Sequence, residues 1–310
     1  MRKIGLAVFS LICLGGCLLG PNYQQPELDL PQNGQPGDQF GIFTTEQWWN
    51  VFEDPVLDGL EEQALTYNQD LQAAIARVDE ARADVGIAKA DQMPSLSAGA
   101  QSGREGNNLG SGESQSTAGL SASFELDLWG KYRRLSEAAR AQLLATEAAR
   151  DTVRLTLTAD VANGYFTLRM LDAQQKILER TLQAREENVR IYESRYKAGY
   201  ATEVDLRRVQ ADKDSVKAQL QQLTLQREQQ ETALAVLLGQ SPRAIIARNI
   251  PRGKTLSELN LVPDVPSDLP SDLLERRPDV RQAEEQLIAA NANIGAARAA
   301  YFPSISRPFH

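Results

Sequence analysis

Histidine and cysteine, which carry much of the acid–base, nucleophilic and metal-binding chemistry of enzymes, are scarce in this 310-residue chain. The one histidine is the last residue, His310, and the two cysteines are Cys13 and Cys17. The sequence contains no phosphate-binding loop and no cluster with metal-ligand spacing, so we expect neither an enzyme nor a metal site. Paired carboxylates such as Glu61 and Glu62 are interpreted as solvated helix faces.

Proline is absent between Pro94 and Pro242, and within residues 135–238 the only glycines are Gly164 and Gly199. Because proline and glycine are the residues that disfavour helix interiors most, their scarcity allows very long helices. Apolar or small residues recur there in the heptad pattern of helices that pack along a seam: Leu157, Val161, Gly164, Leu168, Leu171, Leu178, Leu182, Val189, Tyr192 and Tyr196, then Leu206, Val209, Val216, Leu220, Leu223, Leu234 and Leu237. Gln175 interrupts the first run, and Lys213, Arg227 and Gln230 interrupt the second. From the heptads alone, a solvent-exposed coiled-coil rod with a structural role is the simplest interpretation.

A turn at residues 198–201 divides this stretch into two antiparallel helices, predicted over residues 136–197 and 202–238. Gly199 can adopt the left-handed conformation that ends a helix. Thr202, with Asp205 three residues later, resembles a capping box that starts the next one.

The first residues resemble a bacterial lipoprotein signal. Arg2 and Lys3 precede an apolar run that is too short to span a bilayer, and Leu-Gly-Gly-Cys ends it at Cys17. The resemblance implies cleavage after residue 16 and acylation of Cys17, so a covalent lipid would be the only non-protein group and no disulfide would form. A cysteine that stands at this position by chance is the alternative. Leu18 is not the aspartate that retains such lipoproteins at the inner membrane, which favours the outer membrane.

An excess of positive charge is also lacking. The chain has 33 basic and 41 acidic residues, and loss of Arg2 and Lys3 with the signal leaves 31 basic residues and a formal charge of −10. Because such a chain is repelled by phosphate groups, we expect no nucleic acid as a partner.

Residues 17–53 are interpreted as a lipid-anchored tether, rich in proline, glycine and glutamine, that ends in an aromatic cluster around Trp48, Trp49 and Phe52. The start of a packed core is the favoured interpretation of this cluster. Residues 54–93 are predicted to form two helices, the first capped by Asp54 with Pro55 at its first position, and the second starting near Asn68.

Residues 118–128 alternate strictly between apolar and polar side chains, which is the periodicity of a strand with two unlike faces. About eleven residues suffice for a tilted strand to cross a bilayer. We therefore predict a transmembrane hairpin within residues 94–129, with a weaker partner strand at residues 95–101 and a loop at 103–116. The predicted lipid-facing side chains are Leu120, Phe124, Leu126 and Leu128, with Trp129 at the membrane interface, and the predicted lumen-facing ones are Ser121, Ser123, Glu125 and Asp127.

A hairpin on a soluble domain is the alternative, although an isolated hairpin is marginally stable in water. Strands that cross a membrane cannot leave their edges open. The membrane interpretation therefore requires other chains to close the sheet.

An internal repeat appears near the end of the chain. Residues 70–97 align without a gap with residues 279–306 at an offset of 209, with identical residues that include Gly86 and Gly295. Residues 130–242 are thus the long helical hairpin, residues 243–278 a connector, and residues 279–310 the incomplete start of a second repeat. Residues 307–310, Arg-Pro-Phe-His, break the strand alternation expected there.

Several separate motifs resemble the TolC-like outer membrane factor family, in its OprM/NodT lipoprotein branch. They are the lipoprotein signal followed by Gly-Pro-Asn-Tyr at residue 20, Trp-Trp at 48, Phe-Glu-Leu-Asp-Leu-Trp-Gly at 124, Tyr-Lys-Ala-Gly at 196, Leu-Glu-Arg-Arg-Pro-Asp at 274 and Tyr-Phe-Pro-Ser at 301. The implied fold is mainly α with a transmembrane β part: long periplasmic helical hairpins that form an α-barrel, and strands of a shared outer-membrane β-barrel.

The resemblance also implies a function. Three chains would form a passive duct in the outer membrane that exports drugs or other small molecules, which a periplasmic adaptor (membrane fusion protein) and an inner-membrane pump of the RND type hand on. A periplasmic gate would lie near Gly199, Thr202, Glu203 and Asp205, although ordinary caps and solvated charges explain these residues equally well.

Members of that family carry two complete repeats, so we expect this chain to be a fragment or a truncated product. A lipid-anchored coiled-coil scaffold or adaptor without channel activity, and a truncated channel protein that does not function, are the alternatives in function.

Overall fold

The computed structural model describes residues 18–26, 47–106, 112–247, 250–258, 274 and 276–309. The predicted signal and Cys17 lie outside these residues. The chain forms two compact units: unit 1 comprises Met1–Gln32, Ala74–Asp151 and Ser271–His310, and unit 2 comprises Asn33–Ala73 and Thr152–Pro270. Helices α3 (Gln69–Ala90) and α4 (Lys131–Lys197) contribute residues to both.

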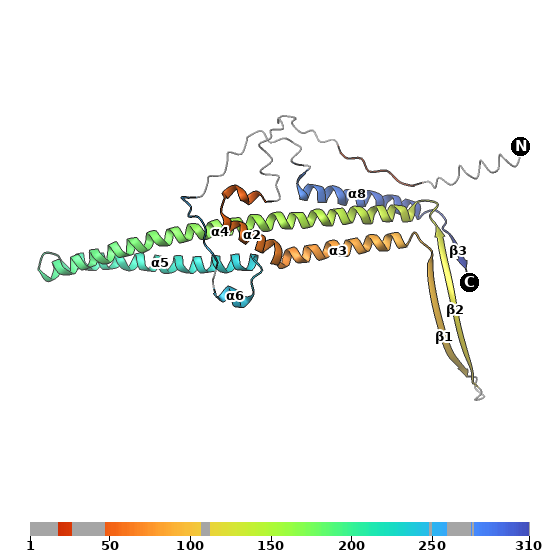
Figure 1. The fold of residues 1–310 in the computed structure, drawn as a ribbon, viewed down its shortest axis with the longest axis horizontal. Coiled ribbons are helices and arrows are strands. Elements are labelled where there is room, and N and C mark those ends of the chain that lie inside the picture. Colours follow the sequence, from red (N-terminus) through yellow and green to blue (C-terminus); the bar gives the residue numbers. More distant parts are fainter. Residues whose placement is uncertain are drawn as a thin grey trace. The chain divides into compact units, whose positions relative to one another are not determined.

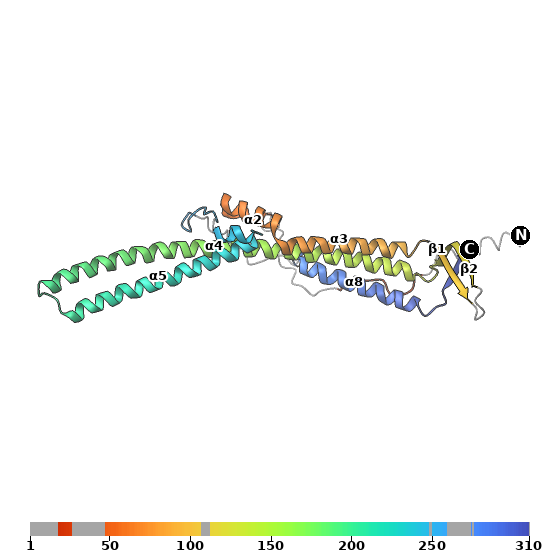
Figure 2. The same ribbon diagram turned by 90° about the horizontal axis from the view of Figure 1, so that it is seen from below.

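Unit 2 is helical and is built around the second part of α4. Its other elements are the 3-10 helix η2 (Trp48–Phe52) and helices α2 (Pro55–Tyr67), α5 (Glu203–Leu237) and α6 (Pro242–Ala247). Helix α5 runs antiparallel to α4 (Figure 2). Gly164 has no side chain, so α5 can approach α4 closely at this position. The Gly164 carbonyl accepts a hydrogen bond from Gln230 Nε2 on α5 at 3.1 Å.

The core of unit 2 lies where η2, α2, α4 and α5 meet. Trp49, Leu57, Tyr165, Leu168 and Leu234 are among its buried residues. Each such side chain contributes about 1.5–3 kcal/mol when fully buried. Trp48 and Phe52 pack against this core, which confirms the interpretation of the aromatic cluster as the start of a core.

The predicted seam is confirmed on α5 and along α4 as far as Tyr192, whereas Tyr196 at the end of α4 is 43% exposed. Every seam position of the sequence pattern on α5, from Leu206 to Leu237, is buried or half-buried, whereas most of their neighbours are exposed. Even Lys213 and Arg227, which interrupt the pattern, lie half-buried. Long basic side chains can lay their methylene groups along an apolar seam and keep the charge in water.

Unit 1 contains the rest of α3, the first part of α4, helix α8 (Pro278–Ala299) and a sheet (Figure 1). Alanines dominate the buried positions of its helices: Ala74, Ala81, Ala138, Ala141, Ala145, Ala148, Ala289, Ala292, Ala296 and Ala299. Small side chains let helix axes approach closely. Arg82 on α3 faces Glu147 on α4 at 3.8 Å, and Gln92 Nε2 donates to the Tyr132 carbonyl at 3.2 Å.

The sheet of unit 1 has three antiparallel strands in the order β1-β2-β3. They are β1 (Ser95–Gly106), β2 (Gly112–Leu126) and β3 (Ile305–Phe309). Both hairpin strands continue into residues predicted to be loop, and only residues 107–111, outside the described part, remain between them. The strands extend because backbone pairing does not require apolar side chains, and serines such as Ser102 and Ser116 pair across them at 3.0 Å.

The break in alternation at Arg307 and Pro308 does not end the strand, since both residues belong to β3. β3 is an edge strand of the described sheet, where the missing N–H of a proline is tolerated. The internal repeat is confirmed: α3 and α8 are both 22-residue helices, and their bounds differ by the predicted offset. In the described part of the chain, we find no helix of the length and hydropathy needed to cross a bilayer.

The interpretation of Glu61 as a solvated carboxylate was wrong. Helix α2 buries Leu57, Leu60 and Ala64, and Glu61 lies on the same face with 0% of its surface exposed. Neither of its carboxylate oxygens has a hydrogen-bond partner among the described residues. Burial first, and the nearby Asp58 second, raise the pKa of Glu61 to about 8.

We predict that Glu61 makes the protein less stable as the pH rises. The unfolded chain ionises this carboxyl above about pH 4.5, whereas the folded chain keeps it protonated up to about pH 8, so stability is lost progressively across this interval. Thermal unfolding between pH 5 and 9 should show a smaller pH dependence for Glu61→Gln than for the unchanged chain. Glu62→Gln, at an exposed neighbour, is the control and should leave the dependence intact; equal slopes for all three proteins would contradict the prediction.

Candidate functional site

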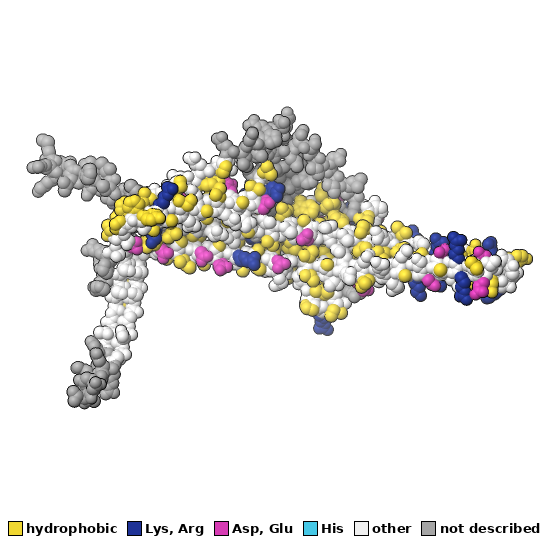
Figure 3. All heavy atoms as spheres, turned by 180° about the vertical axis from the view of Figure 1, so that it is seen from behind, with side chains coloured by type: hydrophobic (Ala, Val, Ile, Leu, Met, Phe, Trp, Pro, Cys, Tyr) yellow, Lys and Arg dark blue, Asp and Glu magenta, His cyan; other side chains and the backbone are white. Residues whose placement is uncertain are grey.

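The hairpin of β1 and β2 has one polar and one apolar face. The Oγ atoms of Ser95 and Ser123 lie 2.7 Å apart, and those of Ser97 and Ser121 lie 2.8 Å apart, so both strands contribute to one serine ladder. On the other face the register pairs Leu96 with Ala122 and Ala98 with Leu120, and Leu120 is 69% exposed. The face of the strand pair seen in Figure 3 carries few hydrophobic side chains. The weaker strand β1 thus shares the alternation of β2.

Asp127, Leu128 and Trp129 are not strand residues, contrary to the sequence prediction, because β2 ends at Leu126. The two oxygens of Asp127 accept hydrogen bonds from the backbone N–H groups of Tyr132 (3.2 Å) and Arg133 (3.0 Å). These N–H groups belong to the first turn of α4 and have no partner within the helix, so the carboxylate acts as a helix cap. Glu125 also faces α4, since its Oε2 accepts from the Tyr132 hydroxyl at 2.8 Å.

Trp129 joins the two repeats at the junction of sheet and helices. Its Nε1 donates to the Pro303 carbonyl at 3.0 Å, and its ring stacks on Phe302 at a centroid distance of 4.7 Å. Gly130, with φ of +77°, then turns the chain into α4. A Cβ on Gly130 would lie 2.7 Å from Leu18 Cδ1, the end of a side chain that can move aside, so the positive φ is the main reason for glycine at this position.

The turn between α4 and α5 has the predicted geometry. Gly199 has φ of +79°, and the Tyr200 N–H donates to the Arg195 carbonyl at 2.8 Å, as in a glycine-terminated helix. Thr202 Oγ1 accepts from the Asp205 N–H at 3.2 Å, and Asp205 Oδ2 accepts from the Thr202 N–H at 3.1 Å, which confirms the capping box. Hydrogen bonds from Thr202, the side-chain one first, lower the pKa of Asp205.

The gate role assigned to this turn stays a prediction. Glu203 pairs with Arg207 at 3.4 Å in an ordinary helix-surface ion pair. Two large side chains at the turn are also strongly exposed: Tyr200 is 86% exposed and Val204 is 77% exposed.

A charged network at the base of the hairpin was not predicted from the sequence. Asp172 on α4 lies within 3.3 Å of Arg169, 3.0 Å of Arg252 and 3.9 Å of Arg227. Arg252 also pairs with the buried Glu231 on α5. Arg169 donates to the backbone carbonyls of Gly253 (3.2 Å) and Lys254 (3.1 Å). The connector after α6 is thereby tied to both helices of the hairpin.

A second set of hydrogen bonds holds the same connector to α2. Asp54 caps α2, as predicted, and its Oδ2 also accepts from the Tyr165 hydroxyl (2.7 Å) and the Lys254 N–H (3.1 Å). Burial first, and the bond to Asp54 second, raise the pKa of Tyr165 to about 12. The Tyr165 hydroxyl in turn accepts from the Gly253 N–H at 3.0 Å. Because these partners are up to 200 residues apart, only the local cap could be recognised in the sequence.

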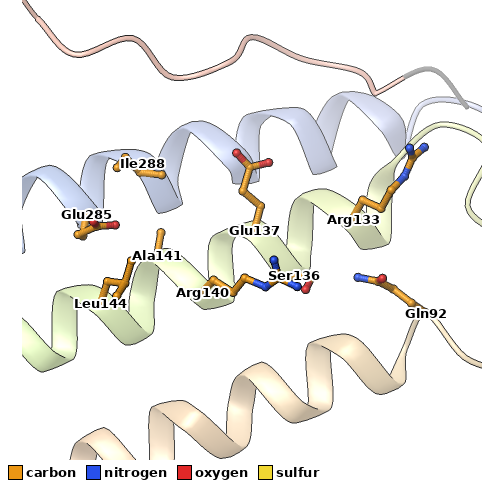
Figure 4. A pocket seen from close by; sticks show the side chains of 9 residues that line it. All are labelled: Gln92, Arg133, Ser136, Glu137, Arg140, Ala141, Leu144, Glu285 and Ile288. Atoms are coloured by element: carbon orange, nitrogen blue, oxygen red, sulfur yellow. The ribbon is translucent and has the colours of Figure 1, made fainter. Parts of the chain in front are cut away.

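A pocket of about 500 Å³ in unit 1 is lined by α4, by α8 and by Gln92, which follows the end of α3 (Figure 4). Arg133, Arg140, Glu137 and Glu285 contribute charges of both signs to its wall, so it favours no class of charged ligand. Within the described residues there is no group of three or more histidine, cysteine or acidic side chains that could hold a metal.

Comparison with known proteins agrees with these features. Residues 60–240 and 269–307 match the family model "Outer membrane efflux protein". The chain is 38% identical over 321 residues to the solvent efflux pump outer membrane protein SrpC of Pseudomonas putida, which covers 99% of this chain and 67% of that protein. It is 36% identical over 305 residues to the cation efflux system protein CusC of Escherichia coli, covering 95% of this chain and 65% of CusC.

Among solved structures, the CmeC outer membrane channel of Campylobacter jejuni superimposes with a TM-score of 0.83 at 27% identity. The superposition covers 94% of this chain and 64% of CmeC. The chain thus spans about two thirds of the length of the proteins that it matches.

We predict that Asp172 is the residue on which the network at the hairpin base depends. Asp172→Ala leaves Arg169 and Arg252 without their shared carboxylate in a half-buried site, and should lower the free energy of unfolding by about 3 kcal/mol. Asp214→Ala removes an exposed carboxylate that pairs with Lys213 at 3.1 Å and should cost less than about 1 kcal/mol. Denaturant unfolding measures both variants, and similar losses would argue against the network.

Proposed function

Because the chain belongs to the outer membrane efflux protein family, we propose that it is the outer membrane channel component of a tripartite efflux system. In this proposal three copies form a passive duct, which exports drugs or other small molecules from the periplasm to the exterior. A periplasmic adaptor and an inner-membrane pump supply the cargo. The helices stand in the periplasm, and a lipid on Cys17 anchors each chain to the outer membrane.

The observation that carries the proposal is the two-faced hairpin. β2 is 15 residues long, more than a tilted strand needs to span the hydrocarbon core. Its apolar face, with Leu120 and Leu126 exposed, suits lipid, and the serine ladder suits a water-filled lumen. In lipid the edges of β1 and β3 need partners, which supports closure by further strands of the assembly.

The two copies of the repeat support a closed assembly by a different route. Helix α8 buries Ala292, Gly295, Ala296 and Ala299, whereas the equivalent residues of α3, Ala83, Gly86, Ile87 and Ala90, are exposed. Conversely, α3 buries Ala74, Val78, Ala81 and Val85, whereas the equivalent Ala283, Leu287, Ala290 and Ile294 of α8 are exposed. The face that is buried on one of these helices is therefore exposed on the other. This is the pattern expected if short and long helices alternate around a ring, so that each short helix packs against a neighbour on both sides.

The long hairpin also has open faces on both sides. On α4, Met170, Ile177, Ala184 and Ile191 form an exposed stripe at heptad spacing outside the α5 seam, beside a shallow groove around Ala184. On α5, Val204, Ala211, Ala218 and Leu225 form a second stripe of mostly smaller side chains. The pair of Asp172 and Arg227 marks equal heights across the hairpin, and by the same counting Leu225 stands level with residue 174, between Met170 and Ile177. Two unlike faces that cover overlapping lengths of the hairpin suit head-to-tail contacts that close into a ring.

We predict that the stripe on α4 is needed for assembly. Ile177→Glu puts a charge into the proposed contact between hairpins, where burying it without a partner is costly, and should convert trimers to monomers. Gln183→Glu adds the same charge at an exposed site off the stripe and should leave the trimer intact. Size-exclusion chromatography with light scattering distinguishes the two outcomes, and a trimeric Ile177→Glu protein would exclude this interface.

The duct itself is tested by expressing the chain with its signal, isolating it from outer membranes and recording ion currents in a planar bilayer. We expect a trimer that conducts without an energy source. A full-length relative such as SrpC provides the positive control. Silence of the chain beside a conducting relative would contradict the proposed duct and favour the scaffold alternative.

A further inference from the structure

Residues 18–23 are fixed to unit 1 by contacts at three successive points. The Leu19 N–H donates to the Trp129 carbonyl at 3.3 Å. Asn291 Nδ2 on α8 donates to the Pro21 carbonyl at 3.0 Å, and the Tyr23 hydroxyl donates to Glu284 at 3.3 Å. This stretch directly follows Cys17 in the sequence.

Arg134 on α4 supplies most of the remaining bonds to this stretch. Its side chain is only 1% exposed. Nε donates to the Leu19 carbonyl (3.2 Å), while Nη2 donates to the Gly20 carbonyl (3.4 Å) and to Asn22 Oδ1 (2.8 Å). Nη1 pairs with Glu137 at 2.8 Å, which balances the charge. A buried arginine whose planar fork binds three residues within one stretch of four recognises that stretch in a fixed register.

Gly20 and Gly295 have no side chains, which leaves room for the N-terminal segment and Arg134 to lie against α8. A Cβ on Gly295 of α8 would lie 2.8 Å from the Leu19 carbonyl oxygen and 2.9 Å from Arg134 Nε. Gly20 has φ of +99°, and a Cβ on it would lie 2.4 Å from the Cα of Gly295. Gly86, the copy of Gly295 in the first repeat, has nothing within 4 Å of such an atom. The requirement for glycine at position 295 therefore comes from the N-terminal segment together with Arg134, which binds that segment, and not from the repeat itself.

We propose that α4 and α8 form a docking groove for residues 19–22, in which Arg134 is the positioning residue and Gly295 the floor. The groove ends at Trp129 and Gly130, where the sheet meets the helices, so it holds the start of the mature chain at that level. This gives the lipid anchor of the proposed function a fixed point of entry and rests on that function only for the lipid. Since α8 belongs to the second repeat, the docked segment depends on the packing of both repeats.

The groove is tested by cross-linking in the full chain, purified from outer membranes. Tyr23→Cys and Glu284→Cys, at the far end of the docked segment, are joined by a short bis-maleimide, and the rate reports docking. Adding Arg134→Lys keeps the charge but loses the fork, and adding Gly295→Ala fills the floor; we expect either to slow cross-linking about tenfold. Gly86→Ala makes the same change in the other repeat and should not alter the rate.

A second cysteine pair separates docking from helix packing. Leu144 on α4 and Ile288 on α8 line the same pocket (Figure 4), so Leu144→Cys with Ile288→Cys should cross-link equally with and without the Arg134 change. Asn22→Ala removes one acceptor of Arg134 without changing a helix, and it should also slow the Tyr23–Glu284 reaction. This variant tests the proposal if the Arg134 variant does not fold. Unchanged rates in Asn22→Ala and Gly295→Ala would overturn the proposal. The cross-linking rate reports docking, whereas the bilayer current reports the duct. Either experiment can therefore fail without contradicting the other proposal.

Discussion

A helix of 67 residues cannot bury its own apolar side chains, and this constraint governs the rest of the molecule. Helix α4 therefore takes a different partner for each stretch and each face. In unit 2 its large residues, such as Tyr165 and Leu168, form a core with η2, α2 and α5. In unit 1 it presents alanines, which suit the close approach of α3 and α8. The change from large to small side chains along one helix matches the change from a bulky core to a thin helical layer.

The same constraint leaves apolar helix faces of the single chain uncovered. Apolar stripes remain open on α4, α5, α3 and α8, and the sheet has open edges in the described part. A soluble monomer seldom exposes so many regularly spaced apolar side chains. The open face of α3 is the copy of the buried face of α8, so the repeat indicates the kind of helix face that would cover it. The proposed assembly is therefore supported by helix packing as well as by the strands.

Periodicity made most of the fold predictable from the sequence. The heptads placed the seam, Gly199 and Thr202 placed the turn, and the alternation in β2 placed the strand. The strand ends were wrong because serine and glycine carry no hydrophobic signal, although they pair as well as other residues through the backbone. Asp127 was predicted to face the lumen because it continues the alternation. In the structure its carboxylate accepts hydrogen bonds from backbone N–H groups in the first turn of α4. Glu61 was taken as solvated because a carboxylate gives no sign in the sequence that its helix face is buried.

Long-range polar contacts were beyond sequence reasoning for a different reason. Arg134 and Gly295 lie 161 positions apart, and nothing local distinguishes them from other helical arginines and glycines. The repeat does offer a signal, since Gly86 and Gly295 are identical although only one of them is crowded by the N-terminal segment.

The turn at Gly199 was placed correctly from the sequence, but its own hydrogen bonds restrict the role that it can have. There the capping box already uses Thr202 Oγ1 and Asp205 Oδ2, so a polar contact from a neighbouring hairpin must either compete with the cap or use the other oxygen of Asp205. A gate built on these residues would then be coupled to the stability of the first turn of α5.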